Sequence, residues 1–177
     1  MRTLDVPQAN DLATVRAVVY AVRKGNLSRE QLAEFTGFSK RHVRYRVHAA
    51  RVLGLIDLES DLASITPLGG RLLAARVKSD EARQVWRDAI ERSPILQVLA
   101  PDLLAQRGPD AETLTERICA ATGASASTAR RRASGLLRWR YTVLGVQPAS
   151  EQPGVQPAPE PKAEPEPANP TEQLSLF

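Results

Sequence analysis

The sequence predicts a mainly helical protein, built from two related helical units and followed by a disordered tail rich in proline. Aromatic residues make up only 5% of the 177 residues, so a core must rest on Leu, Val, Ile and Ala, which suits helices. A motif around Thr36-Gly37 returns around Thr122-Gly123, which indicates a repeated unit. Residues 146–172 hold eight of the 13 prolines and no large apolar residue other than valine, so they cannot bury a core.

Two helices are expected before residue 37. Asn10 is the candidate N-cap of the first helix, and Gly25-Asn26 ends it. Its inner face follows helical spacing and consists of Leu12, Val15, Val18, Val19 and Val22. Ser28 caps the second helix, whose inner face is expected to hold Leu32, Ala33 and Phe35.

The third helix and the elements after it complete a characteristic order. Ser39 caps this helix, which runs to about Leu53, with residues 43, 47 and 50 on its inner face. Residues 55–56 begin a strand, a polar loop covers 57–63, and a second strand covers 64–66. A fourth helix runs from Pro67 toward Val77. This order resembles a winged helix-turn-helix domain, and the segments that carry the resemblance are 28–37, 39–56 and 65–69.

A second unit follows the first. A helix over 79–93 is expected to bridge to it, and Pro101 must break the apolar stretch from Ser93 to Leu104. Residues 113–143 align with residues 27–57 at a constant offset of 86, pairing Ser39 with Ser125 and Leu53 with Trp139. Since Pro148 follows almost at once, the second copy is expected to be truncated, with little or no wing. The expected domains are 1–78 and 79–145, followed by a linker at 146–172 and a peptide at 173–177.

Charge favours a polyanionic partner for the helical units. Residues 1–145 carry 23 Lys and Arg against 15 Asp and Glu, whereas residues 146–177 carry one Lys and five Glu. On the third helix, a basic stripe lies beside the inner face, as on a recognition helix that enters the major groove of DNA. The candidate DNA contacts there are Ser39, Lys40, Arg41, Arg44, His48 and Arg51. The loop of the wing holds only acidic charges, Asp57, Glu59 and Asp61, so this wing is not expected to follow phosphates.

The equivalent helix of the second unit opens with hydroxyl and guanidinium groups, which suit phosphate contacts. Its candidate DNA contacts are Ser125, Ser127, Thr128, Arg130 and Arg131. Arg132 and Arg140 rank below these because they fit structural roles equally well.

The last five residues, Gln173, Leu174, Ser175, Leu176 and Phe177, match the preferred Gln-Leu-Ser/Asp-Leu-Phe form of the bacterial sliding-clamp-binding motif at every position. The resemblance implies that Gln173 supplies amide hydrogen bonds and that Leu176 and Phe177 fill a hydrophobic subsite of the clamp. Residues 146–172 would then act as a tether with polyproline II bias.

The favoured function is therefore a DNA-binding adaptor, cytoplasmic and nucleoid-associated, that acts in replication, repair or replication-linked defence. Its expected partners are double-stranded DNA and the sliding clamp, with a homodimer possible. No catalytic cluster, cofactor, metal site or membrane span is expected, and the lone Cys119 excludes a disulfide framework. Two alternatives remain open: a winged-helix transcriptional regulator, and a tandem winged-helix interaction module like the bacterial segregation-and-condensation B subunit.

Overall fold

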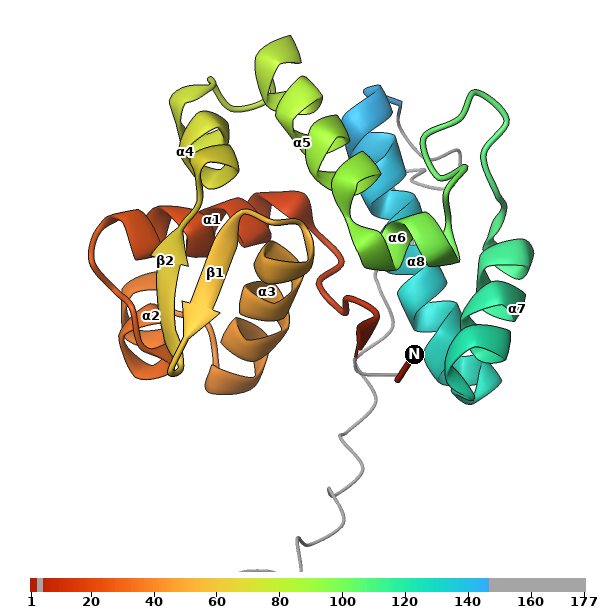
Figure 1. Ribbon diagram of the computed structural model, residues 1–177, viewed down its shortest axis with the longest axis horizontal. Coiled ribbons are helices and arrows are strands. Elements are labelled where there is room, and N and C mark those ends of the chain that lie inside the picture. Colours follow the sequence, from red (N-terminus) through yellow and green to blue (C-terminus); the bar gives the residue numbers. More distant parts are fainter. Residues whose placement is uncertain (3–4, 147–177) are drawn as a thin grey trace, which may run out of the picture.

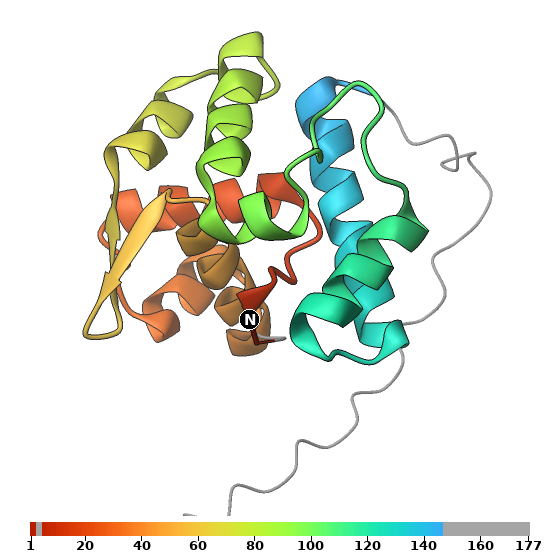
Figure 2. The same cartoon turned by 45° about the vertical axis from the view of Figure 1, so that its right-hand side comes forward.

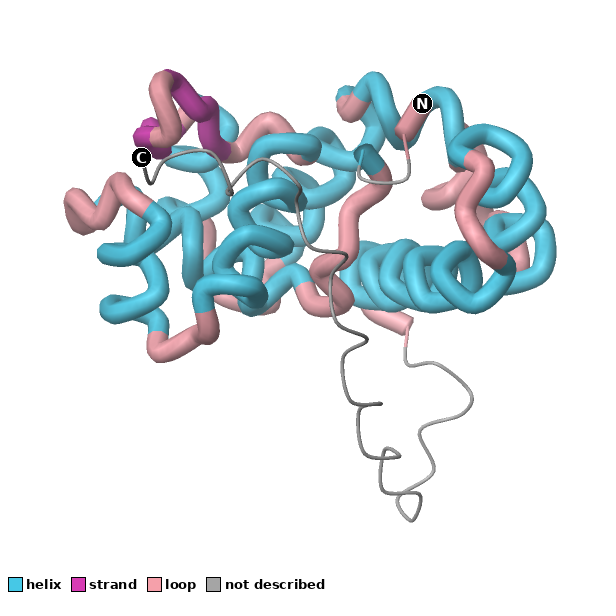
Figure 3. Tube along the Cα trace, turned by 90° about the horizontal axis from the view of Figure 1, so that it is seen from below, coloured by secondary structure: helices cyan, strands magenta, loops and turns pink. Residues whose placement is uncertain are grey.

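The computed structural model describes residues 1–2 and 5–146 (Figure 1). The first helical unit comprises α1 (Leu12–Arg23), α2 (Arg29–Thr36), α3 (Lys40–Val52), β1 (Ile56–Glu59), β2 (Leu62–Ile65) and α4 (Pro67–Ala74). The second helical unit comprises α5 (Asp80–Arg92), α6 (Pro94–Leu99), α7 (Ala111–Thr122) and α8 (Ala126–Leu144). Figure 3 shows the two strands at the end of the molecule away from the second helical unit. The prediction of a mainly helical fold is confirmed.

Local signals account for most helix starts. Ser28 forms a full capping box with Gln31, and the Ser39 hydroxyl accepts a hydrogen bond from the His42 amide. The first helix is an exception, because Asp11 rather than Asn10 caps it, accepting from the amide of Ala13. Asp11 is the residue immediately before the helix, so its carboxylate lies closest to the free amides.

The inner face of α2 also differs from the prediction. Leu32 is buried, but the side chain of Phe35 is 49% exposed and packs against the ring of Tyr20. Phe35 lies three residues after Leu32, at the edge of the buried face, where it meets the ring of Tyr20 of α1, which is itself 45% exposed. The expected core position is therefore wrong.

The hairpin is tighter than predicted. Residues 57–59 belong to β1, and only Ser60 and Asp61 form the turn, both with positive φ. Ile56 pairs with Ile65 and Glu59 with Leu62 in an antiparallel register. The predicted loop over 57–63 is wrong, because polar residues in this range pair across the hairpin, with their side chains on the exposed side of the two strands.

The two helical units share a detailed repeat. The Thr36 hydroxyl donates to the Leu32 carbonyl (2.6 Å), and the Thr122 hydroxyl donates to the Ile118 carbonyl (2.7 Å). Gly37 and Gly123 then end α2 and α7 with φ of 71° and 67°. The predicted repeat is thus confirmed in its hydrogen bonds. After the shared part, α8 continues as helix to Leu144, where the first unit turns into its hairpin.

One continuous core joins the units, and the segment before α1 is part of it. Residues 5–11 run between α3 and α8 (Figure 2). The carbonyls of Val6 and Ala9 accept hydrogen bonds from Arg132 (2.7 Å) and from the indole of Trp139 (2.9 Å). Asp5 offers its carbonyl to His48 on the other side, at 3.2 Å. We call residues 5–11 the N-terminal strap.

Candidate nucleic-acid interface

The first turns of α3 and α8 lie on the same side of the molecule. In Figures 1 and 2 both helices begin at the lower edge and rise from it, with the N-terminal strap between them. A helix N-terminus presents free amides and the positive end of the helix dipole, so each of these ends favours an anion. The exposed candidates at these two helix starts together form a surface that we call the basic face: Ser39, Lys40, Arg41, Arg44, Ser125, Ser127, Arg130 and Arg131.

Four of the six candidates in the first unit belong to this exposed set, namely Ser39, Lys40, Arg41 and Arg44. Arg51 is also exposed, but it lies in the last turn of α3, away from the helix start. Ser39 has a structural task as the N-cap, since its hydroxyl accepts from the His42 amide at 3.3 Å. Lys40 forms a solvent-exposed ion pair with Glu30 of α2 at 3.5 Å. A backbone hydrogen bond and then the charge of Lys40 lower the pKa of Glu30.

Tyr45 adjoins the basic face, and the sequence did not single it out. Its hydroxyl accepts a hydrogen bond from Arg41 Nε at 2.8 Å. The guanidinium carbons of Arg41 and Arg44 lie 5.7 and 5.6 Å from the ring centroid. Burial by itself would raise the pKa of the Tyr45 phenol, but hydrogen bonds from both arginines outweigh it and lower that pKa. The spacing of Arg41, Arg44 and Tyr45 over one helical turn was the available signal.

His48 does not share the exposed stripe, and this part of the prediction is corrected. Its ring is half-buried, and Nε2 lies 3.2 Å from the Asp5 carbonyl in the N-terminal strap. Burial lowers the pKa of His48, and the nearby charge of Arg51 acts in the same direction. Helical spacing had grouped His48 with its basic neighbours, but the strap covers this edge of α3.

The second helical unit repeats the first turn of α3. The Ser125 hydroxyl accepts from the Thr128 amide at 3.4 Å and lies 3.0 Å from the Thr128 hydroxyl. Ser127, Arg130 and Arg131 are exposed around this cap, whereas Thr128 is half-buried. The structure therefore brings four of the five candidates of this unit to the surface.

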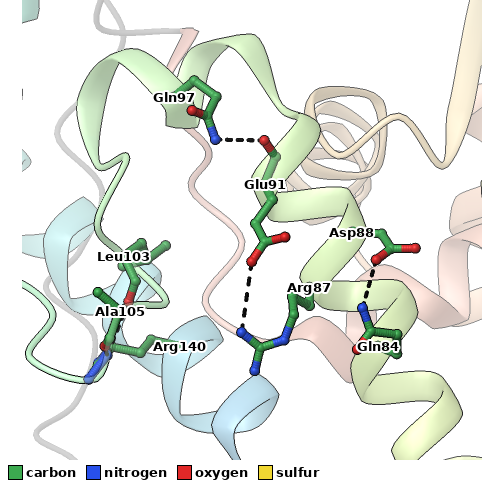
Figure 4. Close-up of polar contacts among 8 residues, drawn as sticks. All are labelled: Gln84, Arg87, Asp88, Glu91, Gln97, Leu103, Ala105 and Arg140. Atoms are coloured by element: carbon green, nitrogen blue, oxygen red, sulfur yellow. Dashed lines mark hydrogen bonds and ion pairs between the residues drawn. The ribbon is translucent and has the colours of Figure 1, made fainter.

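Arg132 and Arg140 have structural contacts within the protein. Arg132 is 4% exposed and binds the N-terminal strap, and burial followed by the charge of Arg131 lowers its pKa. Arg140 donates to the carbonyls of Leu103 and Ala105, both at 3.1 Å (Figure 4). The same view shows Arg87 and Glu91 paired along α5, 3.8 Å apart.

The hairpin offers no cation to this face. Asp57, Glu59 and Asp61 are all exposed, and Asp61 pairs with Arg29 at the start of α2, at 3.8 Å. Within residues 1–2 and 5–146, no group of three or more His, Cys, Asp or Glu side chains could hold a metal ion. No helix in this part of the chain is long and apolar enough to cross a membrane. The candidate clamp-binding residues 173–177 lie outside the described residues.

A family model described as a domain of unknown function, DUF7226, matches residues 15–147. The chain belongs to the DUF7226 family. No curated protein and no solved structure matches the chain. The DUF7226 match runs from α1 through α8, so the family unit contains both helical units together with the basic face between them. It leaves most of residues 147–177 outside.

Proposed function

We propose that this DUF7226 protein is a DNA-binding adaptor that docks on the bacterial polymerase sliding clamp. Its first helical unit acts as a winged helix-turn-helix domain and its second as a related unit without a wing. One observation carries the DNA half of this proposal. Two equivalent helix starts, each with exposed arginines, face the same side and are held together by the N-terminal strap.

The chemistry of the basic face fits a duplex. Arg41, Arg44, Arg130 and Arg131 present guanidinium groups near helix ends, and such groups bind phosphate oxygens in pairs. Contacts of this kind set register and supply affinity, whereas reading of sequence needs base-edge contacts in the groove. The first turn of α3 is the part best placed for base edges.

The hairpin has a different part in this proposal. Its three exposed carboxylates would meet phosphates as like charges, so the hairpin stays out of the groove. The ion pair between Asp61 and Arg29 also turns a positive charge of α2 toward the hairpin. The duplex is therefore expected on the α3 and α8 side of the molecule alone.

Residues 173–177 supply the clamp half. Burying Leu176 and Phe177 is worth roughly 1.5–3 kcal/mol each, and ordering a free peptide consumes part of this. The peptide alone should therefore bind on the order of micromolar or more weakly. Twenty-seven residues in a polyproline II form reach at most about 80 Å, which lets DNA and clamp be held together. Holding both raises the effective concentration of each.

Two sets of variants test the DNA contact. Arg41→Ala with Arg44→Ala, and Arg130→Ala with Arg131→Ala, should each weaken duplex binding about tenfold, and the salt slope should fall by about one for each phosphate that is no longer neutralised. Arg76→Ala with Arg107→Ala is the matched control, since both side chains are exposed and lie outside the basic face. Equal affinities for all three variants would remove the basic face as the DNA site.

The clamp contact needs a separate titration. Leu176→Ala with Phe177→Ala should abolish binding of the full chain to the purified clamp and leave duplex binding intact. Unchanged clamp binding in this variant would sink the clamp half of the proposal.

The acidic hairpin favours a second candidate, a tandem winged-helix interaction module for a protein partner. It predicts that no duplex shifts at low salt, while Asp57→Asn with Glu59→Gln weakens capture of a basic protein. Duplex binding that depends on Arg41 and Arg131 would rule it out as the main function.

A further inference from the structure

Three large apolar side chains are exposed on α1, on α2 and on the segment between these two helices. Tyr20 is 45% exposed, Phe35 is 49% exposed and Leu27 is 37% exposed. The Tyr20 and Phe35 ring centroids are 6.2 Å apart, with the rings tilted by 47°. Residues 24–28 link α1 to α2. The backbone amide of Asn26 donates to the carbonyl of Ala21, the residue after Tyr20, and so holds this link against the end of α1. We call Tyr20, Leu27 and Phe35 the apolar patch.

Hydrogen bonds hold the backbone around Leu27 in place. The Leu27 carbonyl accepts from the Ala63 amide at 3.0 Å, which ties the patch to β2 beside Leu62, a side chain that is 51% exposed. Ser28 caps α2 directly after Leu27. Binding at the Leu27 end of the patch would therefore order little additional backbone of the protein.

The size of the patch limits its occupant. With side chains of roughly 200 Å² each, the three exposed fractions leave on the order of 300 Å² of apolar surface. A stable dimer needs about 800 Å² from each partner, so a second copy would be held too weakly by this patch alone. A short peptide with two or three large apolar side chains fits the area.

Charge narrows the occupant further. Lys24 Nζ lies 5.5 Å above the Tyr20 ring, and Arg23 beside it is also exposed. Glu34, next to Phe35, is exposed as well, so this rim holds two cations and one carboxylate. Its net positive charge favours a peptide that carries acidic residues. The chain itself contains such a segment, residues 172–177, in which Glu172 precedes Leu174, Leu176 and Phe177.

We propose that the apolar patch binds residues 172–177 of the same chain and competes with the sliding clamp for them. The inference rests on the proposed function only for the identity of the competitor. The 26 residues between Val146 and Gln173 reach roughly 80 Å at full extension, which spans the body of the protein. A tether of this kind gives an effective concentration on the order of millimolar. An intrinsic dissociation constant in the millimolar range is thus sufficient to fill the patch about half of the time.

Docking of residues 172–177 on the apolar patch lowers the affinity of the chain for the clamp. A segment that is docked half of the time binds the clamp about twofold more weakly than a free segment, because only the free fraction is competent. Clamp binding in turn empties the patch and exposes Tyr20 and Phe35. The contact therefore lowers clamp affinity in the free protein without any change in the motif itself.

Nuclear magnetic resonance on the ¹⁵N-labelled full chain tests the docking. The amide signals of Leu174, Leu176 and Phe177 should differ from those of a synthetic peptide of residues 171–177. In Tyr20→Ser with Phe35→Ser they should move to the free-peptide positions. Val77→Ser with Val98→Ser is the control, because these side chains are 60% and 70% exposed outside the patch, and it should leave the signals unchanged.

A reciprocal variant guards against misfolding of the patch variant. Leu176→Ser with Phe177→Ser should shift the amide signals of Lys24 and Phe35 and leave those of α5 and α8 in place. Signals of residues 174–177 that equal the free peptide in the wild-type chain would overturn the proposal. Differences that grow with protein concentration would also overturn it, because they would assign the patch to a second copy.

Clamp titration separates this inference from the function it rests on. The patch variant should bind the clamp about twofold more tightly than the wild-type chain. If the chain binds no clamp but shows the signal shifts, the intramolecular contact is supported and the proposed clamp function is refuted. A chain that binds the clamp equally with and without the patch keeps the function and loses the competition.

Discussion

Adjacent glycines at the start of α4 should respond to the same substitution with opposite signs. Gly69 and Gly70 are both helical residues just after the N-cap Thr66. A Cβ on Gly69 would lie 2.1 Å from the Leu55 carbonyl oxygen and 3.1 Å from Ile65 Cγ1, whereas a Cβ on Gly70 would meet no atom within 4 Å. We therefore predict that Gly69→Ala destabilises the protein and that Gly70→Ala stabilises it.

The magnitudes follow from these contacts. Replacing a helical glycine by alanine stabilises by about 0.5–1 kcal/mol where space allows, mainly by restricting the unfolded chain. At Gly69 the obstacle is backbone, so α4 must move away from Leu55. This movement strains the hydrogen bond from the Thr66 amide to Leu55 (3.2 Å) and the one from the Thr66 hydroxyl to Gly54 (2.7 Å). Overpacking and weakened hydrogen bonds together predict a loss of about 2–4 kcal/mol.

Thermal unfolding followed by circular dichroism, with urea unfolding for the free energy, measures both variants. Gly69→Ala should lower Tm by roughly 6–15 °C, and Gly70→Ala should raise it by roughly 1–4 °C. Equal stability of the two variants would refute the close approach of α4 to Leu55.

Three further predictions concern the strap and the basic face. Burial lowers the pKa of His48, so the folded chain binds fewer protons than the unfolded chain as pH falls below about 6.5, and the free energy of unfolding declines. Urea unfolding between pH 7.5 and 5.5 should show a smaller decline for His48→Gln than for the wild-type chain. Trp139→Phe leaves the Ala9 carbonyl without its donor and should lower the free energy of unfolding by about 2–4 kcal/mol. Hydrogen exchange should become faster in the N-terminal strap, and faster exchange in α8 alone would contradict the strap contact. Tyr45→Phe removes the hydroxyl that accepts from Arg41 but keeps the ring, so affinity for duplex DNA should fall severalfold while Tm stays the same. An unchanged affinity would show that Tyr45 does not position Arg41.

The sequence predicted best what depends on neighbouring residues. Ser28 and Ser39 cap their helices as expected, because capping is a contact over three residues. The repeat at an offset of 86 was equally readable, since the same residues form the same turn at Gly37 and Gly123. The prediction that the first unit is a winged helix and the clamp-binding prediction for residues 173–177 stay predictions.

The errors at Phe35 and His48 occur where a segment outside the helix decides the environment. Phe35 has the spacing of a core residue, but it lies against the ring of Tyr20, which is itself 45% exposed, and it remains 49% exposed. His48 has the spacing of a surface residue, but the N-terminal strap lies against it. Helical periodicity places a side chain on a face of its own helix and carries no information about what lies opposite.

By itself, the sequence determined the helices, most of their caps, the repeat and the asymmetry of charge, because each depends on local backbone preference or on composition. Only the tertiary structure decided that the starts of α3 and α8 face the same side, and that Arg132 belongs to the strap while Arg131 belongs to the surface. These outcomes depend on contacts between residues more than a hundred positions apart, such as the hydrogen bond from Trp139 to Ala9. Such contacts form because buried donors need acceptors, and the chain satisfies them wherever packing brings one within reach.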